Sequence, residues 1–144
     1  GGEGAPLTPI FHKYLVKSKR IELPVCILNI GGISNLTLIH SFKNHEILSQ
    51  DVGPGNCLIN SWIQSHTKEK FDKGGKVSNR GKINELILEQ SLETHEHNFK
   101  KKDNISLDTN DFDISFARGL NLEDGAATLT AFSAKILTSK INFL

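Results

Sequence analysis

The 144-residue sequence has no methionine and only two cysteines, one tryptophan and one tyrosine. Two cysteines exclude a disulfide framework and a four-thiolate zinc site. Cys26 and Cys57 each lie in an apolar stretch, so both are predicted to be buried free thiols in a reducing compartment. The missing initiator methionine leads us to expect that the chain was cut from something longer or that its start was removed.

Neither sign of charge dominates, because 17 Lys and Arg stand against 16 Asp and Glu. This balance excludes a strongly basic nucleic-acid binder. No apolar run approaches the ~18 residues that a membrane helix needs, and Gly1–Pro6 lacks the basic and apolar regions of a signal peptide. We therefore expect a cytoplasmic chain that binds neither nucleic acid nor membrane. The length fits one domain, or two small lobes.

Apolar runs predict three strands near the start of the chain. Val25–Ile30 and Ile33–Ile39 are joined by two glycines, which predicts an antiparallel hairpin because glycine tolerates a positive φ. A shorter strand is expected over Glu46–Gln50. Gly53 and Pro54 lie beyond it and are predicted to end that strand.

Helical spacing of apolar residues predicts three helices after these strands. The first begins at Asn56, a candidate N-cap, and a weaker one covers about 83–92. The last begins near Asn121, where an aspartate three residues on suggests a variant of the capping box. Residues 1–9 are interpreted as a loop and 94–113 as a solvated polar loop. This order predicts a mixed α/β fold with an antiparallel start to the sheet.

The strongest local candidate for chemistry is Asp51 with the turn Gly53-Pro54-Gly55 after it. A carboxylate at the C-terminal end of a strand lies where α/β sheets bind their ligands. The glycines let a ligand approach the backbone, and the helix N-terminus at Asn56 offers N–H groups to an anion. The segment can thus supply a base and an anion cradle. An aspartate that only orders a turn gives the same pattern, and spacing alone does not separate the two.

The second candidate is the segment Asn29–Asn35, with Gly31-Gly32 at its centre. Backbone N–H groups of such a turn can bind a phosphate, but a plain hairpin explains the glycines as well. His95 and His97 form a His-x-His pair without further ligands at suitable spacing, so no metal site is predicted.

The chain resembles the anhydro-N-acetylmuramic acid kinases in four segments that stand in that family's order. They are GGEGAPL at 1–7 with Pro9 and His12, LNIGGISNLT at 28–37, DVGPGN at 51–56 and EDGAATLTA at 123–131. The resemblance implies part of a hexokinase/actin/Hsp70-like (ribonuclease H-like) ATPase fold. It also implies that residues 1–22 end the first lobe or join the lobes, and that 23–144 form most of a truncated second lobe.

Membership of this family implies an ATP-dependent sugar kinase of peptidoglycan recycling. Water opens the ring of 1,6-anhydro-N-acetylmuramic acid at C1, and the freed O6 takes the γ-phosphate of ATP with Mg²⁺ on the phosphates. Asp51 matches the family's general base. The residues expected to bind the sugar are Gly2, Glu3, Gly4, Pro54 and Asn56. Those expected to bind the nucleotide are Gly31, Gly32, Ser34 and Asn35.

Four positions depart from the family's pattern. Glu3 replaces the usual glutamine and Val52 the usual threonine, and Ile105 and Thr109 stand where basic residues are usual. Losing two cations from one segment weakens any anion contact made there. The family's first phosphate loop and its adenosine-side glycines do not occur in this sequence either.

These departures leave alternatives open. The chain is either part of a working kinase or a catalytically inactive fragment or decayed gene product. It can also be half of a split kinase. Its partner is then the missing kinase portion, or a second copy of the chain in a homodimer. Another sugar kinase of the same superfamily is disfavoured by the Asp51 motif, because ring opening needs a hydrolytic base.

Overall fold

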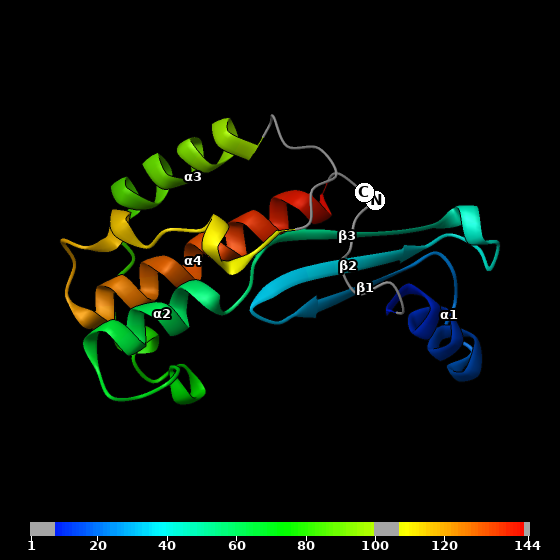
Figure 1. The fold of residues 1–144 in the computed structure, drawn as a ribbon, viewed down its shortest axis with the longest axis horizontal. Coiled ribbons are helices and arrows are strands. Elements are labelled where there is room, and N and C mark those ends of the chain that lie inside the picture. Colours follow the sequence, from blue (N-terminus) through cyan, green and yellow to red (C-terminus); the bar gives the residue numbers. More distant parts are fainter. Residues whose placement is uncertain (1–7, 100–106, 143–144) are drawn as a thin grey trace.

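The computed structural model describes residues 8–99 and 107–142, and in these ranges the fold is mixed α/β as predicted. One three-stranded sheet is flanked by helices (Figure 1). The elements are α1 (Thr8–Lys19), β1 (Val25–Ile30), β2 (Ile33–Ile39), β3 (Ile47–Pro54), α2 (Cys57–His66), α3 (Glu85–Phe99) and α4 (Leu122–Ile141).

The sheet has the order β1-β2-β3, and both strand pairs are antiparallel. Leu36 and Thr37 are neighbours in β2, so their side chains point to opposite faces. Leu36 packs with Val52 and with Leu137 of α4, whereas Thr37 contacts His12 of α1. Helix α4 therefore covers one face of the sheet and α1 lies on the other.

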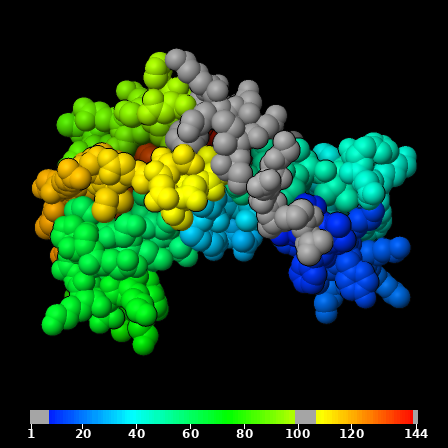
Figure 2. Space-filling model, viewed as in Figure 1, coloured from blue at the N-terminus to red at the C-terminus, as the bar shows by residue number. Residues whose placement is uncertain are grey.

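A second core lies where α2, α3 and α4 meet beyond one end of the sheet (Figure 1). Trp62 of α2 is 1% exposed, and its Nε1 donates to the Leu122 carbonyl at 2.9 Å. A Cβ on Gly125 would stand 2.1 Å from Trp62 Cζ2, so α2 and α4 approach closely because this position is glycine. In Figure 2 this helical end and the α1 end occupy opposite sides of the molecule.

The bounds of β1 and β2 are those predicted, but two other elements differ. Helix α1 was interpreted as a loop through residue 9. It begins at Thr8, and Pro9 fits its first turn because the N–H that proline lacks has no partner there. Strand β3 does not stop before Gly53. It continues to Pro54, which pairs with Ile33, because a proline is tolerated at the end of an edge strand.

For the helices after the sheet, the predicted first residues agree with the structure better than the predicted last residues. Asn121 Oδ1 accepts from the Asp124 N–H at 2.8 Å, which confirms the predicted cap of α4. Helix α3 runs to Phe99, so the expected loop over 94–113 is wrong for 94–99. A short 3-10 turn at Thr109–Asp111 occupies part of the remaining predicted loop, and a second 3-10 turn at Ser115–Ala117 follows it.

The two cysteines differ from each other. Cys26 is exposed, contrary to the prediction, because β1 is an edge strand with an open outer side. Cys57 is half-buried at the start of α2, and this burial raises the pKa of its thiol.

Candidate functional site

A β-bulge sets the direction of Asp51. Asn35 pairs with Asp51 while its neighbour Ser34 pairs with Gly53, so Val52 is the extra residue of β3. The bulge puts the 2% exposed Val52 on the face of α4 and leaves Asp51 on the opposite face. Bulges often redirect side chains beside active sites, and sequence patterning gave no sign of this one.

Asp51 belongs to a row of polar side chains across the sheet. Asn29 pairs with Asn35, and Asn35 pairs with Asp51, so the three lie on one face. Thr37 and Ser49 form the next pair on this face, and their hydroxyl oxygens are 3.3 Å apart. Two predicted site residues, Asp51 and Asn35, are thus brought together by strand register.

The segment that follows α3 in sequence contacts Asp51. The N–H of Leu107 donates to Asp51 Oδ2 at 3.0 Å, and an aspartate capping box over Asp108–Asp111 stabilises the turn that follows. Thr109 Cγ2 would be 3.8 Å from a Cβ on Gly32, so this turn also lies beside the hairpin. Sequence reasoning missed Leu107. The Asp108-x-x-Asp111 spacing signals a turn, but it does not say where the turn docks.

The two glycine segments form one unit. The Gly31 carbonyl accepts from Asn56 N–H at 2.8 Å, and the Gly32 carbonyl accepts from the N–H groups of Gly55 at 2.9 Å and Cys57 at 3.3 Å. The hairpin turn is therefore bonded directly to the start of α2 (Figure 1). Neither Gly31 nor Gly32 has a positive φ, so a left-handed turn does not explain these glycines. A Cβ on Gly31 would be tight against the Ile33 carbonyl oxygen at 3.3 Å, so close packing favours glycine at position 31 only.

This docking corrects one expectation. The N–H groups of Asn56 and Cys57 already serve the hairpin carbonyls, so they do not form the anion cradle predicted at this helix start. Asn56 does occupy the N-cap position of α2, but its side chain makes no capping bond there. Its Oδ1 instead accepts from Asn60 Nδ2 at 3.3 Å.

Two buried polar atoms beside the hairpin have no hydrogen-bond partner among the residues that the structure describes. They are Ser34 Oγ, in a residue with 0% exposure, and Asn35 Oδ1. Buried polar groups are normally satisfied, and those that are not often mark a functional position. Both residues were predicted to bind the nucleotide, and their orphaned atoms are consistent with that prediction.

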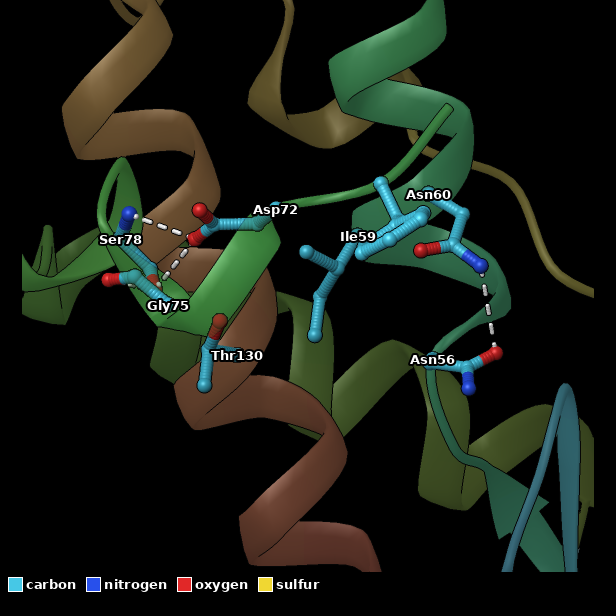
Figure 3. Close-up of a pocket in the computed structure, with 8 residues that line it drawn as sticks. Asn56, Ile59, Asn60, Asp72, Gly75, Ser78 and Thr130 are labelled. Carbon is cyan, nitrogen blue, oxygen red and sulfur yellow. Dashed lines mark hydrogen bonds between the residues drawn. The ribbon is translucent and has the colours of Figure 1, made fainter. Parts of the chain in front are cut away.

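A pocket of about 450 Å³ opens beside Asn56 (Figure 3). Hydrogen bonds from Val77 and Ser78 hold the Asp72 carboxylate at its edge. Burial acts to raise the pKa of Asp72, but these bonds outweigh it and lower the pKa, so this carboxylate orders its own loop. The lining residues are Asn56, Ile59, Asn60, Phe71, Asp72, Gly75, Ser78 and Thr130.

The structure describes some of the remaining predicted site residues and not others. Pro54 ends β3 and is buried beside the Asp51 bulge. Gly2, Glu3, Gly4 and Ile105 lie outside the described residues, so their roles stay predictions. Among the residues that are described, no three His, Cys, Asp or Glu side chains group as a metal site would require. Within the same ranges, no helix combines the length and apolar character of a membrane span.

Comparison with known proteins gives one consistent result. A family model described as "Anhydro-N-acetylmuramic acid kinase" matches residues 1–142. Proteins with that name are similar to this chain in Pelagibacter ubique (49% identity over 98% of the chain), Methylorubrum extorquens (44% over 99%) and Methylobacterium nodulans (41% over 99%). The chain covers 37% of each of these relatives, so it spans little more than a third of their length.

Proposed function

The chain belongs to the anhydro-N-acetylmuramic acid kinase family, and we propose that it provides the general base and the phosphate-facing turn of such a kinase. The observation that carries this proposal is the joining of its two motifs. The Gly31-Gly32 turn is hydrogen-bonded to the segment that follows Asp51, at the end of the bulged strand. A base and a phosphate-binding turn must lie close together in a kinase that also opens the sugar ring.

Asp51 takes a proton from water as the water attacks C1 of the anhydro sugar. The bond from C1 to the bridging oxygen breaks and frees O6. O6 then attacks the γ-phosphorus of ATP, the bond to the β–γ bridging oxygen breaks, and ADP leaves. The Leu107 N–H holds one carboxylate oxygen, which fixes the orientation of the other. A base placed in this way contributes roughly 10²- to 10⁴-fold to the rate.

The residues around the hairpin fit a nucleotide phosphate. A Cβ on Gly32 would be in ordinary van der Waals contact with Thr109 Cγ2 at 3.8 Å, so the turn at Thr109–Asp111 would line this side of a phosphate site. Ser34 Oγ and Asn35 Oδ1 lie next to the turn on opposite faces of β2, and each has hydrogen-bonding capacity that no described residue uses. Mg²⁺ bound with ATP would neutralise the transferring phosphate, and in most kinases the phosphates and a few carboxylates hold it.

A second candidate is a chain that is inactive until another part of the kinase joins it. Ile10, Phe11 and Tyr14 of α1 are 61–71% exposed, an unusual density of apolar side chains on a surface helix. Together with the 37% coverage of the relatives, this favours a second lobe, from residue 23 onward, that needs further chain to complete the cleft. We propose a cytoplasmic kinase in which residues 1–22 end the first lobe or join the lobes.

A chimera tests the proposal. Residues 1–142 replace the matching segment of the Pelagibacter ubique relative, whose 49% identity favours a compatible core. ATP-dependent phosphorylation of 1,6-anhydro-N-acetylmuramic acid is measured with the chimera, the unsubstituted relative and the chain alone. The proposal expects an active chimera that Asp51→Asn slows by about 10²- to 10⁴-fold, and an inactive isolated chain.

Either of two results would reject this function. A folded but inactive chimera beside an active relative would show that the chain is a decayed segment. Retained activity in the Asp51→Asn chimera would remove Asp51 as the base.

A further inference from the structure

Three polar residues lie next to one another on the sheet face opposite α4. Asn29 of β1 pairs with Asn35 of β2, and Asn35 pairs with Asp51 of β3. Leu28 packs with Leu36 toward α4, so the neighbouring Asn29 points to the opposite face. The three strands lie side by side in Figure 1. We call Asn29, Asn35 and Asp51 the polar row.

Asn29 is the member of the polar row that lies beside the Gly31-Gly32 turn. A Cβ on Gly31 would be 3.9 Å from Asn29 Nδ2, so the side-chain amide leans toward the turn. Asn29 is exposed and belongs to an edge strand, so its amide can contact a bound ligand. The amide offers N–H donors, and ionised phosphate oxygens accept such bonds strongly.

The length of the polar row matches the distance over which the proposed reaction extends. Adjacent strands are about 4.8 Å apart, so roughly 10 Å separates Asn29 from Asp51. In the reaction, water lies about 2.8 Å from the base, and reacting atoms approach to about 3–3.5 Å, once at C1 and once at phosphorus. With the C1–O6 bond between them, these separations span roughly 10 Å, because water attacks C1 opposite the bond that breaks. A reaction that begins at Asp51 therefore brings the γ-phosphorus close to Asn29.

We propose that Asn29 binds the γ-phosphate of ATP while it is transferred. This inference rests on the proposed function, which makes Asp51 the base and the Gly31-Gly32 turn the phosphate-facing turn. Asn29 Nδ2 donates a hydrogen bond to a γ-phosphate oxygen and gives up no proton. The bond from O6 to phosphorus forms, the bond to the β–γ bridging oxygen breaks, and that oxygen leaves with ADP. The donor stabilises the charge that spreads over the phosphoryl oxygens during this step.

Binding measurements on the chimera test this, because ADP lacks the phosphate that Asn29 contacts. Asn29→Leu removes the donor from a side chain of similar size, and Asn29→Gln keeps the amide on a longer side chain. Titration calorimetry without the sugar measures the Kd of ADP and of an ATP analogue with an NH group at the β–γ bridge. We expect Asn29→Leu to weaken the binding of the analogue about tenfold and that of ADP less than about twofold. Asn29→Gln is expected to recover part of the loss.

Asn79→Leu is the matched control, because Asn79 is an exposed asparagine in the turn Ser78–Arg80. It should leave both affinities within about twofold of the unsubstituted chimera. Urea unfolding checks that each variant is folded, and Asn29→Ala replaces Asn29→Leu if the leucine variant is not.

Three results overturn the inference while the proposed function stands. They are equal losses for ADP and the analogue, no loss for either, and a loss confined to the binding of the anhydro sugar. A folded but inactive unsubstituted chimera would instead reject the proposed function, and this inference with it.

Discussion

The backbone N–H of Leu107 donates a hydrogen bond to Oδ2 of Asp51, a residue 56 positions earlier in the chain. A main-chain donor can be removed only by proline, so this contact survives almost every substitution at 107. It ties the segment after α3 to the strand that carries the candidate base.

Leu107→Pro removes this donor and leaves the side chain of Asp51 intact. Hydrogen bonds to charged groups contribute about 1.5–3 kcal/mol, so we expect kcat of the chimera to fall by roughly tenfold or more. Leu107→Ala keeps the N–H and is the control. Equal rates for the proline and alanine variants would show that the bond does not orient the base.

Gly55→Ala is expected to disturb the hairpin. A Cβ at this position would stand 2.1 Å from the Gly31 carbonyl oxygen and 2.7 Å from Ser34 Oγ. Relieving such overlap costs about 1–3 kcal/mol or more, and it moves the turn away from α2. Urea unfolding of the two proteins measures the loss. Gly119→Ala, where a Cβ meets nothing within 4 Å, should change the midpoint little, and comparable losses for both would refute the explanation.

Gly125→Ala is expected to destabilise the contact of α2 with α4, because its Cβ would overlap the ring of Trp62. Trp62→Phe shortens that ring but leaves the Leu122 carbonyl without its donor. In the Trp62→Phe background, Gly125→Ala should therefore cost less than in the original chain. Free energies of unfolding for the two singles and the double decide this, and strictly additive penalties would contradict it.

Acid should destabilise the chain through His95. Burial, and then the charge of Lys140, lower the pKa of His95 to about 4 from the ordinary 6.5. The unfolded state therefore binds the proton first, and stability falls as the pH drops from about 6.5 toward about 4. Unfolding of the chain and of His95→Gln at about pH 7 and about pH 5 measures this. His95→Gln should lose part of the acid sensitivity, and an equal decline in both proteins would contradict the assignment.

The local sequence pattern was sufficient to predict the bounds of β1 and β2 and the residue at which α4 begins. Their apolar runs and the Asn121 cap act over a few neighbouring residues, and the structure confirms them. Helix α1 was missed because its apolar residues are largely exposed, with Ile10 at 65% and Tyr14 at 71%, so no amphipathic stripe marked it.

The candidate site was predicted in parts. The Asp51 and Gly31-Gly32 motifs are visible in sequence, and the strand register brings them together. The Val52 bulge and the Leu107 contact depend on packing between distant segments, which leaves no periodic signal. The anion cradle predicted at Asn56 was wrong for the same reason, because the N–H groups of Asn56 and Cys57 donate to carbonyls more than twenty residues earlier.

The three bonds from the carbonyls of Gly31 and Gly32 to the start of α2 have a mechanical consequence. Because α2 is pressed against α4 through Trp62, the turn can be displaced only together with that helix pair. A substitution at the far end of α2 that shifts this helix would therefore also shift the turn. The position of the Gly31-Gly32 turn is therefore expected to respond to substitutions in α2 and α4 that do not contact it.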